Sequence, residues 1–347
     1  AGNLRLDGGA GADLLDLDAI GSSTLGVSGT IGASSAAGYT DDVAGFELQA
    51  DIDFTGIETA WLNLGAGNDS PRIASVSDTL AVTVFAGLGD DVITVGDATA
   101  GVASIQGRVD ISGDLGSDIV ALDDAASIDS AKSSTINDRS IVGLGMGDFS
   151  EGVRFDSIEG VNLELGTSAS PNSSTYVLDV LGTDVPVTIN LGDGDDIVRV
   201  GPDLFRVKAA LMINGGGVTP GNDQLAVQSD LTTNLTVSGG TITATDMPGQ
   251  IISDQFESVA ITLSNSPDTV TVIDTNAELT LDLRDGADEV LIAGTSYAAF
   301  IELGEDADRD LLAVQSVGGM LMVNGDADGS DSVTVDASQS VTPANVS

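Results

Sequence analysis

The sequence predicts an all-β fold, a parallel β-helix or β-solenoid whose coils are roughly 20–27 residues long. Three observations lead to this prediction. A corner rich in glycine and aspartate recurs along the chain, the corners are almost evenly spaced, and the short aliphatic runs between them alternate as β-strands do. Aromatic residues make up only 3% of the chain against 41% hydrophobic residues, so small aliphatic side chains must fill the interior.

The corner is clearest as Gly-Asp-Gly-Asp-Asp at residues 192–196, between the strand-like residues 187–191 and 197–200. Glycine and aspartate tolerate the positive φ angles of a sharp change in chain direction. Corners of this kind close at Asp13, Asp69, Asp91, Asp118, Asp196, Asp223, Asp288, Asp310 and Asp331. Each corner is therefore expected to link two short strands.

The corners define a short period. The sequence numbers of Asp69, Asp91 and Asp118 differ by 91 − 69 = 22 and 118 − 91 = 27, and those of Asp288 and Asp310 differ by 310 − 288 = 22. A fixed period of 20 to 50 residues indicates a solenoid, in which each unit buries its apolar face by stacking on its neighbours.

A longer period is visible in three similar segments, called boxes here, at residues 54–58, 155–159 and 256–260. Each begins with a phenylalanine, and Phe54, Phe155 and Phe256 are 101 residues apart. We expect these rings to fill the interior where a coil widens. The period predicts long repeats at roughly residues 23–132, 133–232 and 233–347. Three tandem immunoglobulin-like sandwiches of about 100 residues would share this long period, but they would have no reason to show the short one.

The boxes could also form a ligand site built from a recurring glutamate. Glu58 and Glu159 stand at the same place in the first two boxes, whereas Ala260 stands there in the third. Because the acid is not repeated, core plugs are the preferred interpretation. Residues 1–347 are interpreted as one continuous solenoid, and as a piece of a longer chain because Ala1 is not methionine and residues 8–13 already follow the repeat.

Charge restricts the partners. The chain has 54 acidic and 11 basic residues, a net charge of −43, which disfavours nucleic acid and anionic membranes and favours cations. It has no cysteine and no histidine, so disulfides, thiolate chemistry and common zinc sites are excluded. No apolar run reaches the roughly 18 residues of a membrane span, so no membrane insertion is expected.

The corner aspartates predict calcium. Stacked coils would bring equivalent carboxylates about 5 Å apart, where they repel by roughly 1 to 3 kcal/mol. Ca²⁺ accepts six to eight oxygens in flexible geometry, so the corner aspartates with nearby carbonyl groups are candidate ligands. The alternative is a set of Asx and glycine turns whose charge is screened by mobile Na⁺.

The corners at residues 65–69, 87–91 and 192–196 resemble the Gly-Gly-x-Gly-x-Asp-x-aliphatic-x repeat of RTX, or haemolysin-type, calcium-binding proteins. That resemblance implies large secreted or surface bacterial proteins whose repeats coil around Ca²⁺. The family motif recurs in tandem every nine positions, whereas here a whole coil separates one corner from the next. The departure implies longer coils and fewer cation sites, closer to the parallel β-helices of giant bacterial surface proteins.

We therefore expect a non-enzymatic extracellular segment of an adhesin, surface layer or surface filament, stiffened by Ca²⁺. Its partners would be calcium ions, further copies of itself or a cell-surface polysaccharide. Carboxylates beside the corners, namely Asp90, Asp193 and Asp195, should point outward and take part in assembly.

Two other functions, a polysaccharide-acting enzyme module and an ice-binding protein, fit the sequence less well. A module of a secreted polysaccharide lyase or epimerase is the main alternative, but the chain has few candidate bases, and the acid pairs Asp41 with Asp42 and Asp123 with Asp124 are interpreted as chance. Ice binding would require a regular Thr-x-Thr face, and residues 241–245 are isolated in this respect.

Overall fold

The computed structural model describes residues 4–18, 26–38, 51–127, 131–147, 152–166, 175–216, 221–304, 308–325 and 330–336. These parts of the chain are all-β, apart from the short 3₁₀ turns η1 (Val102–Ser104) and η2 (Leu204–Arg206). No helix within these ranges is long and apolar enough to cross a membrane. The chain divides into two compact units, residues 1–174 with 185–192 and residues 175–184 with 193–347.

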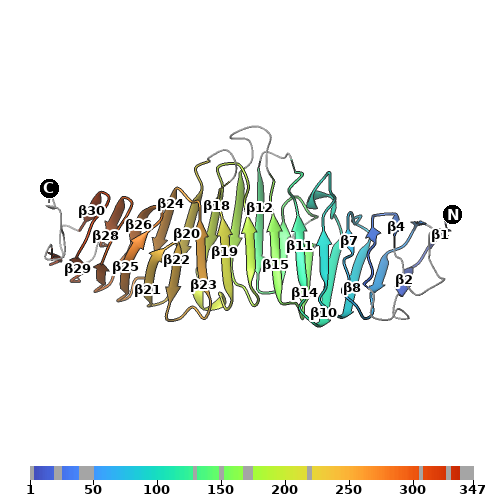
Figure 1. Cartoon of the computed structure of the whole chain (residues 1–347), viewed down its shortest axis with the longest axis horizontal. Helices are drawn as coiled ribbons and strands as arrows, with labels where there is room; N and C mark the ends of the chain where they lie inside the picture. The colour runs from blue at the N-terminus through green and yellow to red at the C-terminus, as the bar shows by residue number, and fades with distance from the viewer. Residues whose placement is uncertain are drawn as a thin grey trace. The chain divides into compact units, whose positions relative to one another are not determined.

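The first unit has two mostly parallel sheets, named A and B here (Figure 1). Neighbours in its sheet A follow the order β1 (Leu4–Asp7), β5 (Ile52–Thr55), β4 (Ser35–Ala37), β3 (Thr30–Ile31), β7 (Arg72–Ile73), β9 (Val92–Val95), β11 (Ile119–Asp123), β15 (Gly160–Glu164) and β17 (Val187–Asn190). Neighbours in its sheet B follow the order β2 (Leu14–Asp18), β6 (Thr59–Asn63), β8 (Ala81–Leu88), β10 (Arg108–Leu115), β14 (Gly152–Asp156), β13 (Ser140–Gly143) and β12 (Lys132–Asn137).

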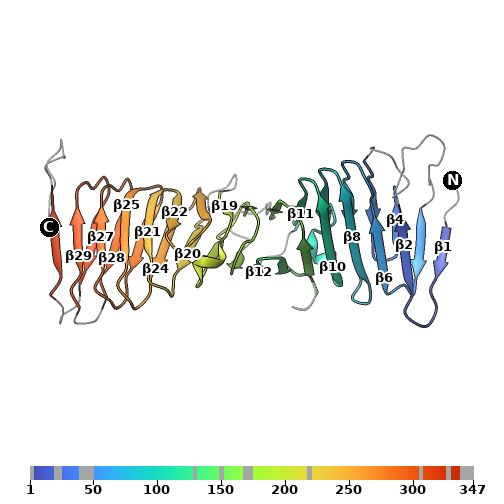
Figure 2. The same cartoon turned by 90° about the horizontal axis from the view of Figure 1, so that it is seen from below.

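The second unit repeats this plan (Figure 2). Neighbours in its own sheet B follow the order β16 (Tyr176–Val180), β18 (Ile197–Val200), β20 (Gln224–Gln228), β24 (Ser258–Thr262), β26 (Glu278–Asp282), β28 (Ala299–Glu302) and β30 (Leu321–Asn324). Neighbours in its own sheet A follow the order β19 (Ala210–Asn214), β23 (Gln250–Asp254), β22 (Thr241–Ala244), β21 (Asn234–Gly239), β25 (Thr269–Thr275), β27 (Glu289–Ile292), β29 (Leu311–Val314) and β31 (Ser332–Val335).

Parallel pairing stacks aliphatic side chains from successive corner-to-corner segments, called short repeats below. In β18, Val198 lies in register with Leu178 on one side and with Leu225 on the other, and all three are buried. This confirms the predicted packing of residues 197–200 between neighbouring aliphatic runs. Mostly parallel sheets contradict tandem immunoglobulin-like sandwiches, whose strands are antiparallel, and they are compatible with a parallel β-helix.

Antiparallel pairing occurs at three hairpins among the described strands. They are β3 with β4, β12 with β13, and β21 with β22, and each pairs onward with the strand that follows it in the chain, β5, β14 or β23. Phe54 lies in β5, Phe155 lies in β14, and Phe256 follows the end of β23. All three phenylalanines are buried, which confirms the prediction that they are core plugs.

Candidate functional site

The corner aspartates form ladders of hydrogen bonds between short repeats. The backbone N–H of Asp69 donates to Oδ1 of Asp91 over 2.7 Å, and the N–H of Asp91 donates to Oδ1 of Asp118 over 2.9 Å. Each carboxylate thus accepts the N–H of the corner one short repeat earlier. We call this arrangement the inner ladder, because Asp69, Asp91 and Asp118 are all buried.

The second unit contains two inner ladders. In one, which leads into sheet B, the N–H of Tyr176 donates to Asp196 over 2.7 Å, and the N–H of Asp196 donates to Asp223 over 2.8 Å. The other leads into sheet A and runs through Asp268, Asp288, Asp310 and Asp331, with donor-acceptor distances of 2.6, 2.8 and 3.2 Å. The predicted corner aspartates of this unit therefore lie in two separate ladders.

In four inner-ladder aspartates the two oxygens have different surroundings, whereas in Asp268 Oδ1 accepts the N–H of Thr233 and Oδ2 accepts from Ser264. Oδ1 of Asp91 accepts a backbone N–H, while Oδ2 of the same side chain is buried with no hydrogen-bond partner. The same is true of Asp69, Asp118 and Asp196. A buried acceptor that has lost water without replacement is costly, so these oxygens create a demand for a proton or a cation.

The pKa values reflect this demand. Burial raises the pKa of Asp91 from 3.8 to about 7, against the lowering effect of the N–H from Asp69, and the charges of Asp69 and Asp118 raise it further. Burial likewise raises the pKa of Asp223 to about 7. For Asp69 and Asp196 the same cause raises the pKa to about 6. Repulsion between neighbouring corner carboxylates, expected from the sequence, is thus one of the causes at Asp91.

At three corners a glutamate accepts the ladder N–H across an intervening hairpin. The N–H of Asp13 donates to Glu58 over 2.8 Å, and the N–H of Asp118 donates to Glu159 over 2.7 Å. The third equivalent is Glu257, which accepts the N–H of Asp223 over 2.7 Å. The donor aspartates follow an exact spacing, since 118 − 13 and 223 − 118 are both 105.

This finding corrects the alignment of the third box. The sequence comparison placed Ala260 opposite Glu58 and Glu159, because it aligned Phe256 with Phe155. Backbone conformation gives the true register: the second residue before each ladder glutamate has a positive φ, 62° at Gly56, 52° at Ser157 and 59° at Gln255. Phe256 therefore corresponds to the position just before the glutamate, and the acid is present in all three boxes.

A second set of bonds lies outside the first and runs in the opposite direction. The N–H of Asp90 donates to Oδ1 of Asn68 over 3.0 Å, and the N–H of Ser117 donates to Oδ1 of Asp90 over 3.0 Å. In the second unit the N–H of Asn222 donates to Asp195 over 2.9 Å. Asp90 and Asp195 are exposed, as predicted, so we call this arrangement the outer ladder. The same prediction is wrong for Asp193, which is buried.

Glycines allow these corners to approach one another closely. A Cβ added to Gly116 would lie 1.5 Å from the carbonyl oxygen of Gly89, and a Cβ added to Gly221 would lie 1.5 Å from that of Gly194. Gly116 also has a φ of 151°. Only glycine fits at such a position, so the backbone contact between corners depends on this residue type.

One of the two acid pairs proposed as chance neighbours, Asp123 with Asp124, has separate cationic partners. Asp123 pairs with Arg72 at 3.1 Å, while the buried Asp124 pairs with the buried Lys132 at 2.9 Å. Two adjacent carboxylates with separate cationic partners do not share a proton as a catalytic dyad does. Asp41 and Asp42 lie outside the described residues.

The predicted metal ligands can be compared with what a metal requires. Across the described ranges, no three Asp or Glu side chains converge in a geometry that could hold a metal ion. Ca²⁺ takes six to eight oxygens, whereas an inner-ladder aspartate such as Asp91 offers one oxygen that is not already bonded to an N–H. The arrangement therefore accepts backbone N–H groups and can take up protons, and calcium at the corners stays a prediction.

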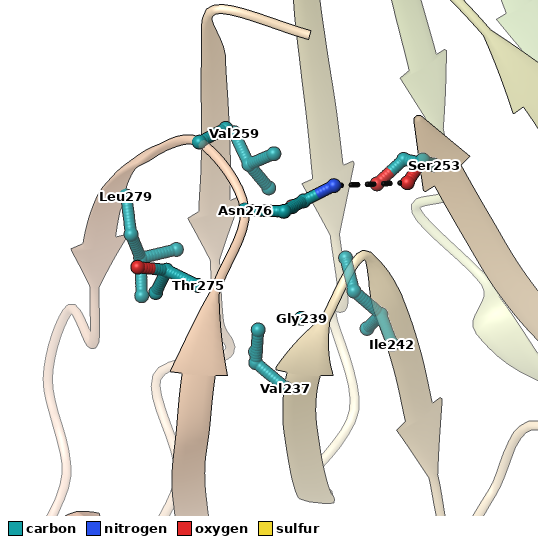
Figure 3. A pocket seen from close by; sticks show the side chains of 9 residues that line it. Val237, Gly239, Ile242, Ser253, Val259, Thr275, Asn276 and Leu279 are labelled. Carbon is teal, nitrogen blue, oxygen red and sulfur yellow. Dashed lines mark hydrogen bonds between the residues drawn. The ribbon is translucent and has the colours of Figure 1, made fainter. Parts of the chain in front are cut away.

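A small cavity lies within the second unit, between the hairpin strands β21 and β22 and the strands β24 and β26 (Figure 3). Its volume is about 10 Å³, and its lining includes Val237, Ile242, Val259 and Leu279. Asn276 closes one side by donating from Nδ2 to the carbonyl oxygen of Ser253 over 3.1 Å. The volume suits one water molecule at most, so the cavity is not a ligand site.

No family model matches the chain, and no curated protein matches it significantly.

Four inner-ladder acids are absent from the predicted metal site, namely Glu58, Glu159, Glu257 and Asp268. Asp268 closes a corner of Ser-Asn-Ser-Pro, so it fits the short period, with 288 − 268 = 20, but not the glycine-based motif. Glu257 was hidden by the phenylalanine beside it. The constant spacing from Asp13 to Asp118 to Asp223 is the signal that would have found it.

Proposed function

We propose that this chain is a non-enzymatic structural segment, a parallel β-helix that forms part of an extracellular surface protein such as an adhesin, surface layer or filament. The inner ladder is the observation that carries the proposal. One oxygen of each carboxylate accepts a backbone N–H of a neighbouring repeat, with Asp91 and Asp223 as examples in the two units. Acids used in this way stabilise the stacking of successive repeats, which is the role of a structural segment.

The charge distribution supports an environment rich in cations. A net charge of −43 on 347 residues favours extended, soluble segments and repels copies of the same chain. The unpartnered Oδ2 atoms of Asp69, Asp91, Asp118 and Asp196 add a local need for positive charge. Calcium supplied from outside the cell would meet both needs, and the resemblance of the corners to RTX repeats supports the same ion.

The first experiment tests calcium on the folded chain. The full chain is treated with a chelator, and its thermal unfolding is followed with added Ca²⁺ and with NaCl at matched ionic strength. We expect Ca²⁺ to raise the melting temperature more than NaCl does, because ligation adds binding free energy to the folded state whereas salt only screens repulsion. Equal effects of the two salts would refute calcium binding and leave the ladders as cation-independent hydrogen bonds.

The second experiment tests assembly. Light scattering of the full chain should show monomers without Ca²⁺ and larger species with millimolar Ca²⁺. The double variant Asp90→Asn with Asp195→Asn should weaken this association while the chain stays folded, because an asparagine keeps the outer-ladder bond, as Asn68 does naturally. Glu278→Gln is the matched control, an exposed acid outside the corners.

The outcomes distinguish the proposed roles. A folded chain that stays monomeric at every Ca²⁺ concentration would exclude a lattice or filament element and leave a passive spacer. Turnover of a polysaccharide by the purified chain would contradict the structural role altogether.

A further inference from the structure

An aromatic pair faces solvent on the outer side of sheet B in the first unit. Trp61 of β6 and Phe85 of β8 are each 40% exposed, although the neighbouring Leu62 and Val84 point inward and are buried. The ring centroids of Trp61 and Phe85 are 6.3 Å apart and their planes meet at 89°. Because the planes are perpendicular, one ring can lie flat against a ligand while the other forms a side wall.

A shallow groove lies beside this pair, across strands β8, β10 and β14. Its volume is about 220 Å³, below the roughly 300 to 1,000 Å³ of a pocket for a drug-sized molecule. Its lining is Thr83, Asp110, Ile111, Ser112, Arg154, Phe155 and Asp156. Hydroxyl, carboxylate and guanidinium groups thus surround a space suited to one ring-sized unit of a longer ligand.

Strand register aligns the aromatic pair with the groove. Trp61, Thr83, Asp110 and Arg154 stand opposite one another on the successive strands β6, β8, β10 and β14. With strands roughly 4.8 Å apart, this row extends about 14 Å across the sheet. On its other side Trp61 stands opposite the exposed Asp16 of β2. From Trp61 to Arg154 an aromatic ring is followed by hydrogen-bonding groups, so this stretch is suited to an extended ligand with apolar faces and polar edges.

The charge around the groove differs from that of the chain as a whole. The chain has only 11 basic residues, yet three arginines gather here. Arg108 pairs with Asp110 at 2.6 Å and Arg139 pairs with Asp156 at 2.6 Å, while Arg154 lines the groove itself. The lining acids are therefore compensated locally, within a chain whose net charge of −43 repels anions.

We propose that this face of the first unit binds a neutral polysaccharide, with a sugar ring stacked on the Trp61–Phe85 pair and the next ring in the groove among Thr83, Asp110 and Arg154. A pyranose ring has an apolar face of C–H groups and a rim of hydroxyl groups. The face matches the exposed aromatic pair, and the rim matches the side chains that line the groove. A sugar chain without charge avoids the repulsion that an acidic one would meet.

A second copy of the chain fits this surface less well. A stable interface buries about 800 Å² per partner around a hydrophobic centre. Here two rings stand beside paired charges, and a second copy would add its own charge of −43. Binding of a sugar is independent of the structural role proposed above, so either proposal can fail without the other.

The experiment uses the chain's single tryptophan as a reporter, since Trp61 is itself part of the proposed site. Cellohexaose, laminarihexaose, maltohexaose and mannohexaose are titrated to millimolar concentration into the full chain, and hexagalacturonate serves as an acidic comparison. At least one neutral sugar should change the emission of Trp61 and release heat in calorimetry.

Variants then locate the binding. Trp61→Ala should lower the association constant measured by calorimetry at least about tenfold, and Trp61→Phe should recover part of it. Phe205→Ala removes a 56% exposed aromatic side chain from the second unit and should leave binding unchanged. Circular dichroism and the melting temperature verify that each variant is folded.

Several results would overturn the proposal. These are no response to any neutral sugar, binding of hexagalacturonate alone, or equal binding by Trp61→Ala. A sugar-insensitive dimer that Trp61→Ala abolishes in sedimentation would show instead that this face contacts a second copy.

Discussion

The two units build their corners with the same bonds but present different outer faces on sheet B. From Asp69 to Asp91 to Asp118 in the first unit, each carboxylate accepts the preceding corner's N–H over 2.7–2.9 Å. From Tyr176 to Asp196 to Asp223 in the second unit, the corresponding distances are 2.7–2.8 Å. On the outer face, however, the first unit exposes Trp61 and Phe85, whereas strand β20 of the second unit presents Ala226 and Gln228 at its outward positions. Positions that hold the backbone are thus alike in the two units, and positions that face solvent are where they differ.

The largest expected effect tests whether both units depend on glycine contacts equally. Gly116→Ala in the first unit and Gly221→Ala in the second would each place a Cβ 1.5 Å from a carbonyl oxygen. We expect each to lower the free energy of unfolding by more than about 3 kcal/mol, measured by chemical denaturation.

Gly239→Ala is the control for this pair. Its φ is 57°, and a Cβ there would meet no atom within 4 Å, so it should cost only about 1 kcal/mol. A similar cost at all three glycines would show that the close approach of corners is unimportant.

The next effect concerns the inner ladders. Asp91→Ala and Asp223→Ala would each remove the acceptor of a backbone N–H, that of Asp69 in one unit and of Asp196 in the other. We expect each to cost about 1–3 kcal/mol at pH 5, where the native side chain is largely neutral. Thermal or chemical denaturation measures this, and a difference between the two variants would show that one ladder carries more of the stability.

Asparagine at the same positions should behave differently. Asp91→Asn and Asp223→Asn keep an oxygen acceptor and remove the buried charge. At pH 8 these variants should be at least as stable as the native chain, and a large loss would show that the carboxylates are stabilised by a bound cation.

A smaller effect is the dependence of stability on pH, which should be similar in both units. The folded-state pKa values of Asp91 and Asp223 are raised to about 7 and those of Asp69 and Asp196 to about 6, from an ordinary value of 3.8. Between pH 4 and pH 7 the folded state therefore binds more protons than the unfolded state. The free energy of unfolding should fall as pH rises from 5 to 8 and then level off for these groups.

Melting temperatures at pH 5 and pH 8, at one ionic strength and without divalent ions, measure this slope. The double variant Asp91→Asn with Asp223→Asn should flatten it, whereas Glu278→Gln should not. Higher stability at pH 8 than at pH 5 in the native chain would contradict the raised pKa values.

The smallest effect concerns the outer ladders. Asp90→Ala and Asp195→Ala should each cost about 0.5–1 kcal/mol, because these side chains are exposed and water can replace the lost bond. Each asparagine variant should be almost neutral. If these variants lose as much free energy of unfolding as Asp91→Ala, the exposed outer ladder stabilises the fold as strongly as the buried inner ladder does.

Much of the fold was predictable because it depends on local pattern. The strand-like residues 197–200 were expected to stack by their apolar face, and Val198 and Val200 are buried there. The register of the third box was not predictable in this way. Phe155 lies four residues before its ladder glutamate, whereas Phe256 lies directly before Glu257, so aligning the two phenylalanines misplaces the glutamate. The positive φ at Gln255 decides the register, and glutamine gives no hint of it.

The chemistry of the corner was predictable only in part. The sequence shows that carboxylates gather at corners, but it does not show whether an oxygen of Asp91 meets a cation or an N–H. That depends on how the corners of Asp69 and Asp91 are aligned, which is a property of stacking. Trp61 illustrates the same limit, because its outward position follows from the burial of Ala60 and Leu62 on either side of it.

The direction of the inner ladder has a consequence for how such a chain can change length. Every corner offers an N–H to one side and a carboxylate to the other, so residues 92–118 could be lost in a single deletion with a compatible junction on both sides. The N–H of Asp69 would still donate to the carboxylate of Asp91. The N–H of Asp91 would then donate to Glu159, which in the full chain accepts the N–H of Asp118. Insertions or deletions that are not whole multiples of a repeat would leave an unmatched donor in the interior. We therefore expect duplications and deletions in the gene to add or remove whole repeats.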